Sequence, residues 1–307
     1  MEQGAREGDS RSQTDFRTRV SARHSLDHVF TALVYAATAV GLIILAVLLA
    51  SVLRDGVPRI DWQFITGYPS QVLPETAGIY PALLGSLWLL GLTAVISVPL
   101  GIGAAVYLEE YATDTWFNRV VEINISNLAG VPSIIYGLLG LGIFVNLLGF
   151  ITGPHSGGQS ILTGALTLSL LILPVIIITT REALRAISDS VREGGYALGA
   201  TRWEVIWGHL LPMALPGALT GTILALSRAI GETAPLVVVG ALTYINYAPT
   251  GPLSSYTALP RQIYFWIEQA QDEYKVLAAA AIVVLMAVLL LANSVAIIIR
   301  NRYQGRT

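Results

Sequence analysis

The sequence of 307 residues contains no cysteine and a single lysine. The absence of cysteine excludes disulfides, iron–sulfur clusters and thiolate zinc sites. A phosphate-cradling P-loop requires Gly-Lys followed by Ser or Thr, whereas Lys275 lies between Tyr274 and Val276. The chain therefore cannot be an ATPase by that route. No paired carboxylates and no nucleophile–base arrangement stand out as a catalytic site.

Charged residues are also scarce. They make up 12% of the chain, while apolar residues make up 54%. A soluble domain carries about twice that charged fraction, roughly 25%. The net charge of −2 gives no reason to expect a nucleic-acid partner. Long apolar runs with so few charges are typical of a membrane protein in contact with lipid.

Six apolar runs are each long enough to cross roughly 30 Å of hydrocarbon as a helix that rises about 1.5 Å per residue. Backbone groups in lipid must be bonded internally, so we expect helices rather than open strands. The predicted fold class is therefore an all-α integral membrane protein. Its spans are residues 29–53, 79–108, 123–151, 161–180, a fifth from 215 that is broken at Pro235 and continues toward 247, and 276–299. The first run lacks a cleavage pattern and is interpreted as an uncleaved span.

The distribution of arginine predicts the orientation of these spans. Thirteen arginines lie on the side of the N-terminus, against three arginines and Lys275 on the other side. Because cytoplasmic loops carry the excess of Arg and Lys, both termini and the loop 181–209 are expected in the cytoplasm. The tail 1–28 mixes both charge signs and is expected to be disordered. Residues 29–300 then form the transmembrane domain, and 301–307 form a second cytoplasmic tail.

The cytoplasmic loop 181–209 is helical in character. Apolar residues recur at near-helical spacing from Ala183 to Tyr196, and the glycines at 194, 195 and 199 permit a break. Thr201 followed by Glu204 matches a capping box at the start of a second helix. The residues alone leave two interpretations open. The loop either rests on lipid headgroups or docks a cytoplasmic partner.

Arg228 and Glu232 lie four residues apart within the apolar stretch 215–239. Charges inside a membrane cost at least a few kcal/mol each, so they are functional candidates by default. On a helix at about 100° per residue, both share a stripe about 80° wide with Gly217, Gly221 and Ala225, which favours a face toward other helices. A helix that enters near Gly217 places Arg228 roughly 16 Å deep.

The chemistry of the pair favours an anion site. A guanidinium holds an oxyanion with a fork of donors, and Glu232 is expected to position Arg228 and keep a passing anion from being trapped. The alternative is a salt bridge that only stabilises the bundle. Thr233 is a further donor candidate, although a bond from its hydroxyl to the preceding helical turn is favoured. Ser133 and Tyr136 either line the pathway or serve inter-helix packing and hydrogen bonding.

Two sets of residues resemble a known family. Glu182-Ala183-Leu184, Gly199-Ala200 and Leu211-Pro212 resemble the EAA loop of ABC-importer permeases, with Leu184 where a second Ala is often found. The segments RAIGETAP at 228–235, PLGIGAAVYLEEYA at 99–112 and GVPSIIYGLLG at 130–140 resemble bacterial phosphate permeases. Of the two permease types in that family, the PstA type carries GETAP. The resemblance is therefore to the PstA type and covers about residues 79–300.

This resemblance implies the fold of small ABC-importer permeases and ATP-driven import of phosphate by alternating access at the bacterial inner membrane. The EAA loop would form a coupling helix on the ATPase. The implied partners are a second permease of the PstC type, a dimer of PstB-type ATPases that carry ATP and Mg, and an extracytoplasmic PstS-type phosphate-binding protein. No cofactor is implied for this chain. The alternatives are a permease for another oxyanion, such as phosphonate or sulfate, and a self-contained channel or secondary transporter.

Overall fold

The computed structural model describes the backbone of residues 3–242 and 244–304 and the side chains of residues 27–242 and 244–302. Every regular element in that part is helical, as the apolar runs predict. The chain divides into two units, residues 1–54 and 55–307. The first unit holds most of α1 (Gln3–Gly56). The predicted disorder of the tail 1–28 falls mostly on residues whose side chains lie outside this description, and it stays a prediction.

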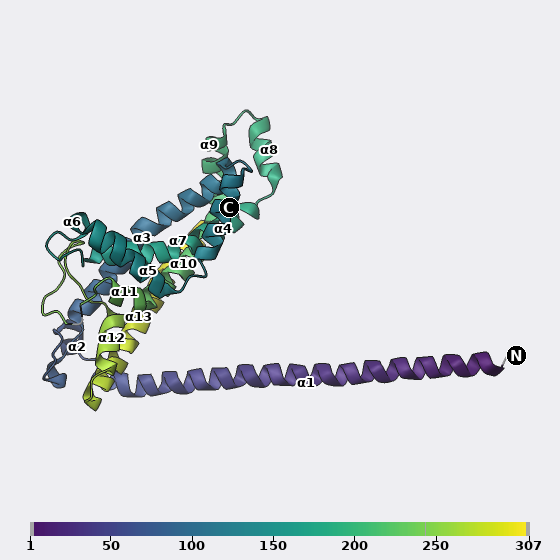
Figure 1. Ribbon diagram of the computed structural model, residues 1–307, viewed down its shortest axis with the longest axis horizontal. Helices are drawn as coiled ribbons and strands as arrows, with labels where there is room; N and C mark the ends of the chain where they lie inside the picture. The colour runs from purple at the N-terminus through teal and green to yellow at the C-terminus, as the bar shows by residue number, and fades with distance from the viewer. Residues whose placement is uncertain (1–2, 243, 305–307) are drawn as a thin grey trace. The chain divides into compact units, whose positions relative to one another are not determined.

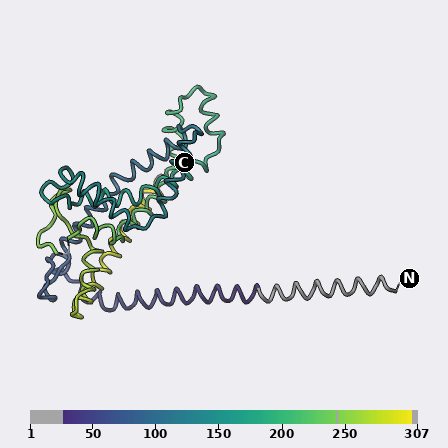
Figure 2. The backbone as a smooth tube through the Cα atoms, in the orientation of Figure 1, coloured from purple at the N-terminus to yellow at the C-terminus, as the bar shows by residue number. Residues whose placement is uncertain are grey.

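Long helices dominate the second unit. They are α3 (Tyr80–Val106) with the π-helical turn η3 (Tyr107–Tyr111), α7 (Ile161–Arg185), α10 (Leu211–Gly231) and α13 (Asp272–Gln304). They pack side by side into one bundle (Figures 1 and 2). Within the described residues, five helices are long and apolar enough to cross a membrane, or six if one bent pair counts as a span. This agrees with the six spans expected.

The bent pair corrects the third predicted span. The apolar run 123–151 is not one continuous helix. The pair consists of α4 (Trp116–Leu128) and α5 (Ser133–Gly140), which η4 (Leu141–Leu147) continues, and its two limbs meet at 110°. The short helix α6 (Gly149–Thr152) follows. Pro132 precedes α5 with ψ of 136° and carries no backbone N–H, so the helix cannot pass through this position.

Two ends of the bundle differ in character (Figure 1). At the loop end lie α8 (Asp189–Ala197), α9 (Arg202–Val205) and the π-helical turn η5 (Ile206–Leu210), which leads into α10. At the cap end lie η1 (Val57–Arg59), α2 (Trp62–Thr66), η2 (Pro74–Thr76) and α12 (Leu259–Ile267). Phe64, Trp266 and Tyr274 are buried together in this cap. The cap end is therefore a packed layer rather than a set of loose connections.

Candidate functional site

The end of α10 carries the charged pair. The helix stops at Gly231 because Glu232 leaves the helical region, with φ −75° and ψ 119°. The chain resumes as the short helix α11 (Ala234–Val238), which has Pro235 in its first turn. This corrects the position of the break, which is predicted from the sequence at Pro235. The break lies three residues before Pro235, and Glu232 is the C-cap of α10 rather than part of its last turn.

Arg228 and Glu232 nevertheless bond to each other. The Arg228 Nε donates to Glu232 Oε1 at 3.3 Å. The Arg228 side chain is 48% exposed and that of Glu232 is 17% exposed on this chain. The pair is therefore half open to the surroundings rather than sealed inside the bundle, and a ligand or a second chain can reach it.

The small-residue stripe of α10 faces another helix, as projected. A Cβ on Gly217 would lie 2.7 Å from the Cβ of Ala183, and one on Gly221 would overlap Thr179. Ala225 is buried as well. These three residues fix α10 against α7 at close range. Arg228, on the same stripe, extends past this contact and is exposed.

The helix α5 brings two further candidates toward the break after α10. Tyr136 is buried against Ala225 and Ala229, and a Cβ on Gly137 would lie 2.8 Å from Pro235 Cα. The Tyr136 hydroxyl donates to the Leu128 carbonyl at 2.8 Å and so holds the corner between α4 and α5. This geometry agrees with the packing interpretation of Tyr136. Ser133 at the start of α5 and Thr233 after the break are half-buried.

The residues that resemble the EAA loop mostly support the shape of that loop. Leu184 is fully buried in a cluster with Leu210 and Ala214, and Ala200 packs against the same cluster. Ala183 touches α10 at Gly217, while Glu182 is exposed. Gly199 has φ +85°, a conformation that favours glycine. Leu211 and Pro212 form the first turn of α10.

The predicted capping box is present. The Thr201 side chain accepts from the Glu204 backbone N–H, and the Glu204 carboxylate accepts from the Thr201 backbone N–H at 2.7 Å. The bonds that this carboxylate accepts from the Thr201 backbone N–H and hydroxyl hold the pKa of the Glu204 carboxyl below its ordinary value. Gly194 and Gly195 lie inside α8. The expected break is therefore made by Gly199 alone, and two short helices flank it.

Apolar side chains stand out from the loop end. Leu198 is 91% exposed, and Tyr196, Trp203 and Trp207 are exposed as well. The rings of Trp203 and Trp207 meet edge to face with centroids 5.3 Å apart. We call Tyr196, Leu198, Trp203 and Trp207 the loop patch. Exposed apolar groups gathered in this way are typical of an interaction surface.

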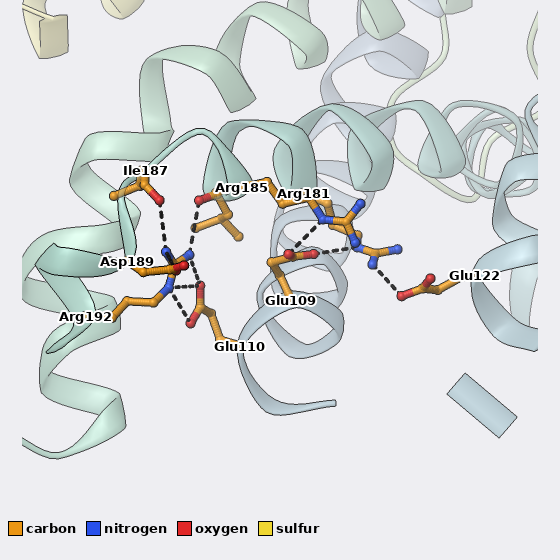
Figure 3. A network of polar contacts seen from close by, with 9 residues as sticks. Glu109, Glu110, Glu122, Arg181, Arg185, Ile187, Asp189 and Arg192 are labelled. Carbon is orange, nitrogen blue, oxygen red and sulfur yellow. Dashed lines mark hydrogen bonds and ion pairs between the residues drawn. The ribbon is translucent and has the colours of Figure 1, made fainter. Parts of the chain in front are cut away.

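The carboxylates of Glu109 and Glu110 take part in a network of ion pairs (Figure 3). Glu109 accepts from Arg181 Nε at 3.1 Å and from Arg185 Nε at 2.8 Å. Arg181 also bonds to Glu122 of α4. Glu110 accepts from Arg192 Nη2 at 2.7 Å. This bond raises the pKa of the Arg192 guanidinium above its ordinary value.

Sequence reasoning missed this network because its partners lie far apart in the chain. Glu109 and Arg181 are separated by 72 residues, and Glu110 and Arg192 by 82. The sequence did contain one usable signal. Two adjacent glutamates follow one predicted span and three arginines follow another, and both sets are expected on the cytoplasmic side. No group of three His, Cys, Asp or Glu side chains suited to a metal ion occurs among the described residues.

Comparisons with known proteins agree with this architecture. A family described as binding-protein-dependent transport system inner membrane component matches residues 97–304. Phosphate transport system permease protein PstA 1 of Mycobacterium tuberculosis (strain CDC 1551 / Oshkosh) is 40% identical over 237 residues, which cover 75% of each chain. The probable phosphate transport system permease protein PstA of Methanocaldococcus jannaschii is 32% identical over 267 residues, covering 86% of this chain and 90% of that one.

Solved structures of low identity share the fold. A chain of the bacterial alginate ABC transporter, in complex with alginate pentasaccharide-bound periplasmic protein, matches with a TM-score of 0.63 at 18% identity. The match covers 89% of this chain and 96% of that one. A chain of the inward-facing MetNI methionine ABC transporter matches with a TM-score of 0.55 at 19% identity, covering 79% and 96%.

Proposed function

Because the chain belongs to the family of binding-protein-dependent transport system inner membrane components, we propose that it is the PstA-type permease of a bacterial importer of inorganic phosphate. The observation that carries the proposal is the 40% identity to the phosphate permease of M. tuberculosis over three quarters of both chains. The family match over residues 97–304 includes both the charged pair and the cytoplasmic loop.

The charged pair is the proposed contact with the anion. Phosphate reaches Arg228 at the break after α10, where the guanidinium is half exposed. Its bond to Glu232 uses one of five N–H donors, so a fork remains for two phosphate oxygens. The carboxylate of Glu232 opposes the anion and limits its affinity, because a pathway must admit its cargo without retaining it. Thr233 adds a hydroxyl beside the pair. Ser133 at the start of α5 lines the approach, and Tyr136 holds the corner behind it.

A second permease of the PstC type closes the other side of this pathway. Such a partner would cover the exposed part of the Arg228 side chain. Alternating access then follows from a change in how the two permeases meet. Both termini and the loop end lie in the cytoplasm, since that side carries most of the arginines. The cap end receives phosphate from an extracytoplasmic binding protein of the PstS type. The membrane is the bacterial inner membrane.

Energy comes from a PstB-type ATPase dimer that holds ATP and Mg. The loop patch supplies the docking surface, with Leu198 as its most exposed member. Glu182, exposed near the end of α7, adds a charged contact for the ATPase. Gly199, Ala200, Ala183 and Leu184 hold the loop in shape, and Leu211 with Pro212 joins it to α10. Movement of the ATPases therefore reaches α10, which carries Arg228.

Reconstitution of the purified four-component system in liposomes tests this proposal. We expect uptake of labelled phosphate that requires ATP inside, the binding protein outside and all permease and ATPase subunits. Excess unlabelled sulfate or phosphonate should leave the uptake unchanged, whereas unlabelled phosphate should abolish it. Uptake without ATPase subunits would indicate a channel or secondary transporter. Competition by sulfate or phosphonate at equal concentration would assign another oxyanion.

A further inference from the structure

Arg192 of α8 joins three elements at the loop end (Figure 3). Its Nη2 and Nε atoms donate to the Glu110 carboxylate at 2.7 and 3.2 Å. Its Nη1 donates to the Ile187 carbonyl at 3.0 Å and its Nη2 to the Leu184 carbonyl at 3.1 Å, at the end of α7. The Glu110 side chain is 6% exposed and that of Arg192 is 16% exposed. A charge-assisted pair with this geometry and burial is stronger than one at the surface.

The other attachments of α8 are slight. No residue of α8 is buried. Val191 is half-buried against the cluster around Leu184, and a Cβ on Gly195 would lie 2.6 Å from Val205. An element with few buried apolar contacts is easily displaced from its neighbours. The bonds of Arg192 are therefore the principal hold of α8 on the rest of the bundle.

The partner of Arg192 sits at one end of α3, and α3 reaches the cap end. There the Leu259 backbone N–H donates to Ser86 Oγ at 2.8 Å, and Gly85 lies directly against the Thr257 carbonyl. Ser86 and Leu89 of α3 also line a small cavity with Ala229 and Ile230, next to Arg228. One helix thus extends from the loop end to the cap and lines a cavity with the last turn of α10.

We propose that Glu110 and Arg192 are positioning residues that pass movement of α8 to α3, and through α3 to the cap segment at Thr257–Leu259. The inference rests on the proposed function and adds to it a route separate from the direct connection between the loop and α10. Glu109 holds η3, the turn that follows α3, against α7 through its bonds to Arg181 and Arg185. Glu110, in the same turn, is the carboxylate that bonds to α8. The π-helical turn that carries both residues is a feature frequent at functional sites.

The test measures coupling rather than activity alone. Reconstituted complexes are compared for phosphate imported per ATP hydrolysed in the wild type, Glu110→Gln and Arg192→Gln. We expect this ratio to fall about tenfold in both variants while ATP hydrolysis continues, within the usual range of coupling between sites. Asp114→Asn is the matched control, because its ion pair with Arg119 lies at the same end but is exposed. That variant should keep the wild-type ratio.

Covalent rescue separates transmission from stability. The chain has no native cysteine, so Glu110→Cys with Arg192→Cys creates a single reactive pair, studied with cysteine-free partner subunits. A short bis-methanethiosulfonate cross-linker, which forms a disulfide with each thiol and releases sulfinate, should restore the ratio, and reduction of these disulfides should remove it again. An unchanged ratio in both single variants would overturn the proposal. The proposal would also be overturned if cross-linking of the double-cysteine variant raised only the yield of assembled complex, with a wild-type ratio of phosphate to ATP before and after reduction. The pair would then serve only assembly.

A cargo-independent measurement keeps this test distinct from that of the proposed function. Spin labels at Leu87 of α3 and Phe150 of α6, both exposed, report movement of α3 on addition of ATP. The distance change should be present in the wild type and absent in Arg192→Gln, whichever anion is carried. If α3 moves in the wild type although no phosphate is imported, phosphate is not the transported anion, but the connection through Glu110 and Arg192 still holds. Equal movement of α3 in Arg192→Gln would contradict the proposed transmission from α8 to α3.

Discussion

Arg228 donates from Nε to Glu232 Oε1 at 3.3 Å across the point where α10 ends. The pair spans a helix terminus rather than one helical turn, because Glu232 has already left the helix. Its carboxylate therefore does not follow the helical repeat of α10. Arg228, by contrast, is held by a helix that is fixed to α7 at Gly217 and Gly221. The proposed phosphate contact rests on this arrangement of a cation on a packed helix and a carboxylate just beyond its end.

Replacement of Glu232 by Gln should tighten phosphate binding and slow transport. The neutral amide no longer opposes the anion, so the site retains phosphate longer. We expect the apparent KM for phosphate and the maximal rate each to fall by about three- to tenfold, consistent with loss of a modest electrostatic contact. Initial rates over a range of phosphate concentrations measure both. A raised KM with an unchanged maximal rate would contradict this role of Glu232.

Replacement of Gly221 by Ala should destabilise the bundle. The added Cβ would overlap Thr179 on α7, so the two helices must separate. Overpacking of this kind costs about 1–3 kcal/mol. The thermal unfolding midpoint of the purified chain in detergent measures the effect. Gly231→Ala on the same helix is the control, because an added Cβ there has no neighbour within 4 Å, and an equal loss in both variants would refute the explanation.

Replacement of Leu198 by Glu should weaken attachment of the ATPase without unfolding the permease. The side chain is almost fully exposed, so the charge costs the isolated chain nothing, whereas burial at an interface would penalise it. We expect at least about a tenfold loss of affinity, equal to 1.4 kcal/mol. Titration of the ATPase onto permease in nanodiscs measures this loss. Val72→Glu, exposed at the cap end, should bind normally.

Replacement of Gly199 by Ala should loosen the loop end. At φ +85° a side chain costs about 1–2 kcal/mol. Gly194→Ala should have the opposite sign, because that glycine lies inside α8 with free space around it and Ala is favoured in helices by about 0.5–1 kcal/mol. Hydrogen exchange of the α8 amides should accelerate in the first variant and slow in the second. The same direction in both would contradict this account.

Local signals in the sequence located several elements well. Ile161 begins α7 as predicted, because Ser160 caps it by accepting from the Thr163 N–H. Thr201 and Glu204 form the capping box that their spacing indicates. The spacing of Gly217, Gly221 and Ala225 identified the face of α10 that meets another helix. In each case the information lies within a few residues, which is the range over which sequence pattern predicts structure.

The misplaced features depend on backbone geometry and distant contacts. Apolar character continues through Pro132 and Glu232, so hydropathy did not reveal the bend before α5 or the end of α10. Glu110 and Arg192 meet only because α3 and α8 converge in the fold, and nothing near either residue signals the other. Trp266 and Phe64 likewise form the cap through packing of segments far apart in the chain. The roles of Ser133, Thr233 and Glu182 stay predictions.

The central claim is that Arg228 serves the passage of phosphate, and one measurement tests it directly. Labelled phosphate uptake is compared in cells that lack their own phosphate permeases and express this chain with its partners, at equal membrane abundance of each variant. We predict that Arg228→Gln abolishes uptake and that Arg228→Lys retains a small part of it, since Lys keeps the charge but loses the fork of donors. Normal uptake by Arg228→Gln would contradict the account.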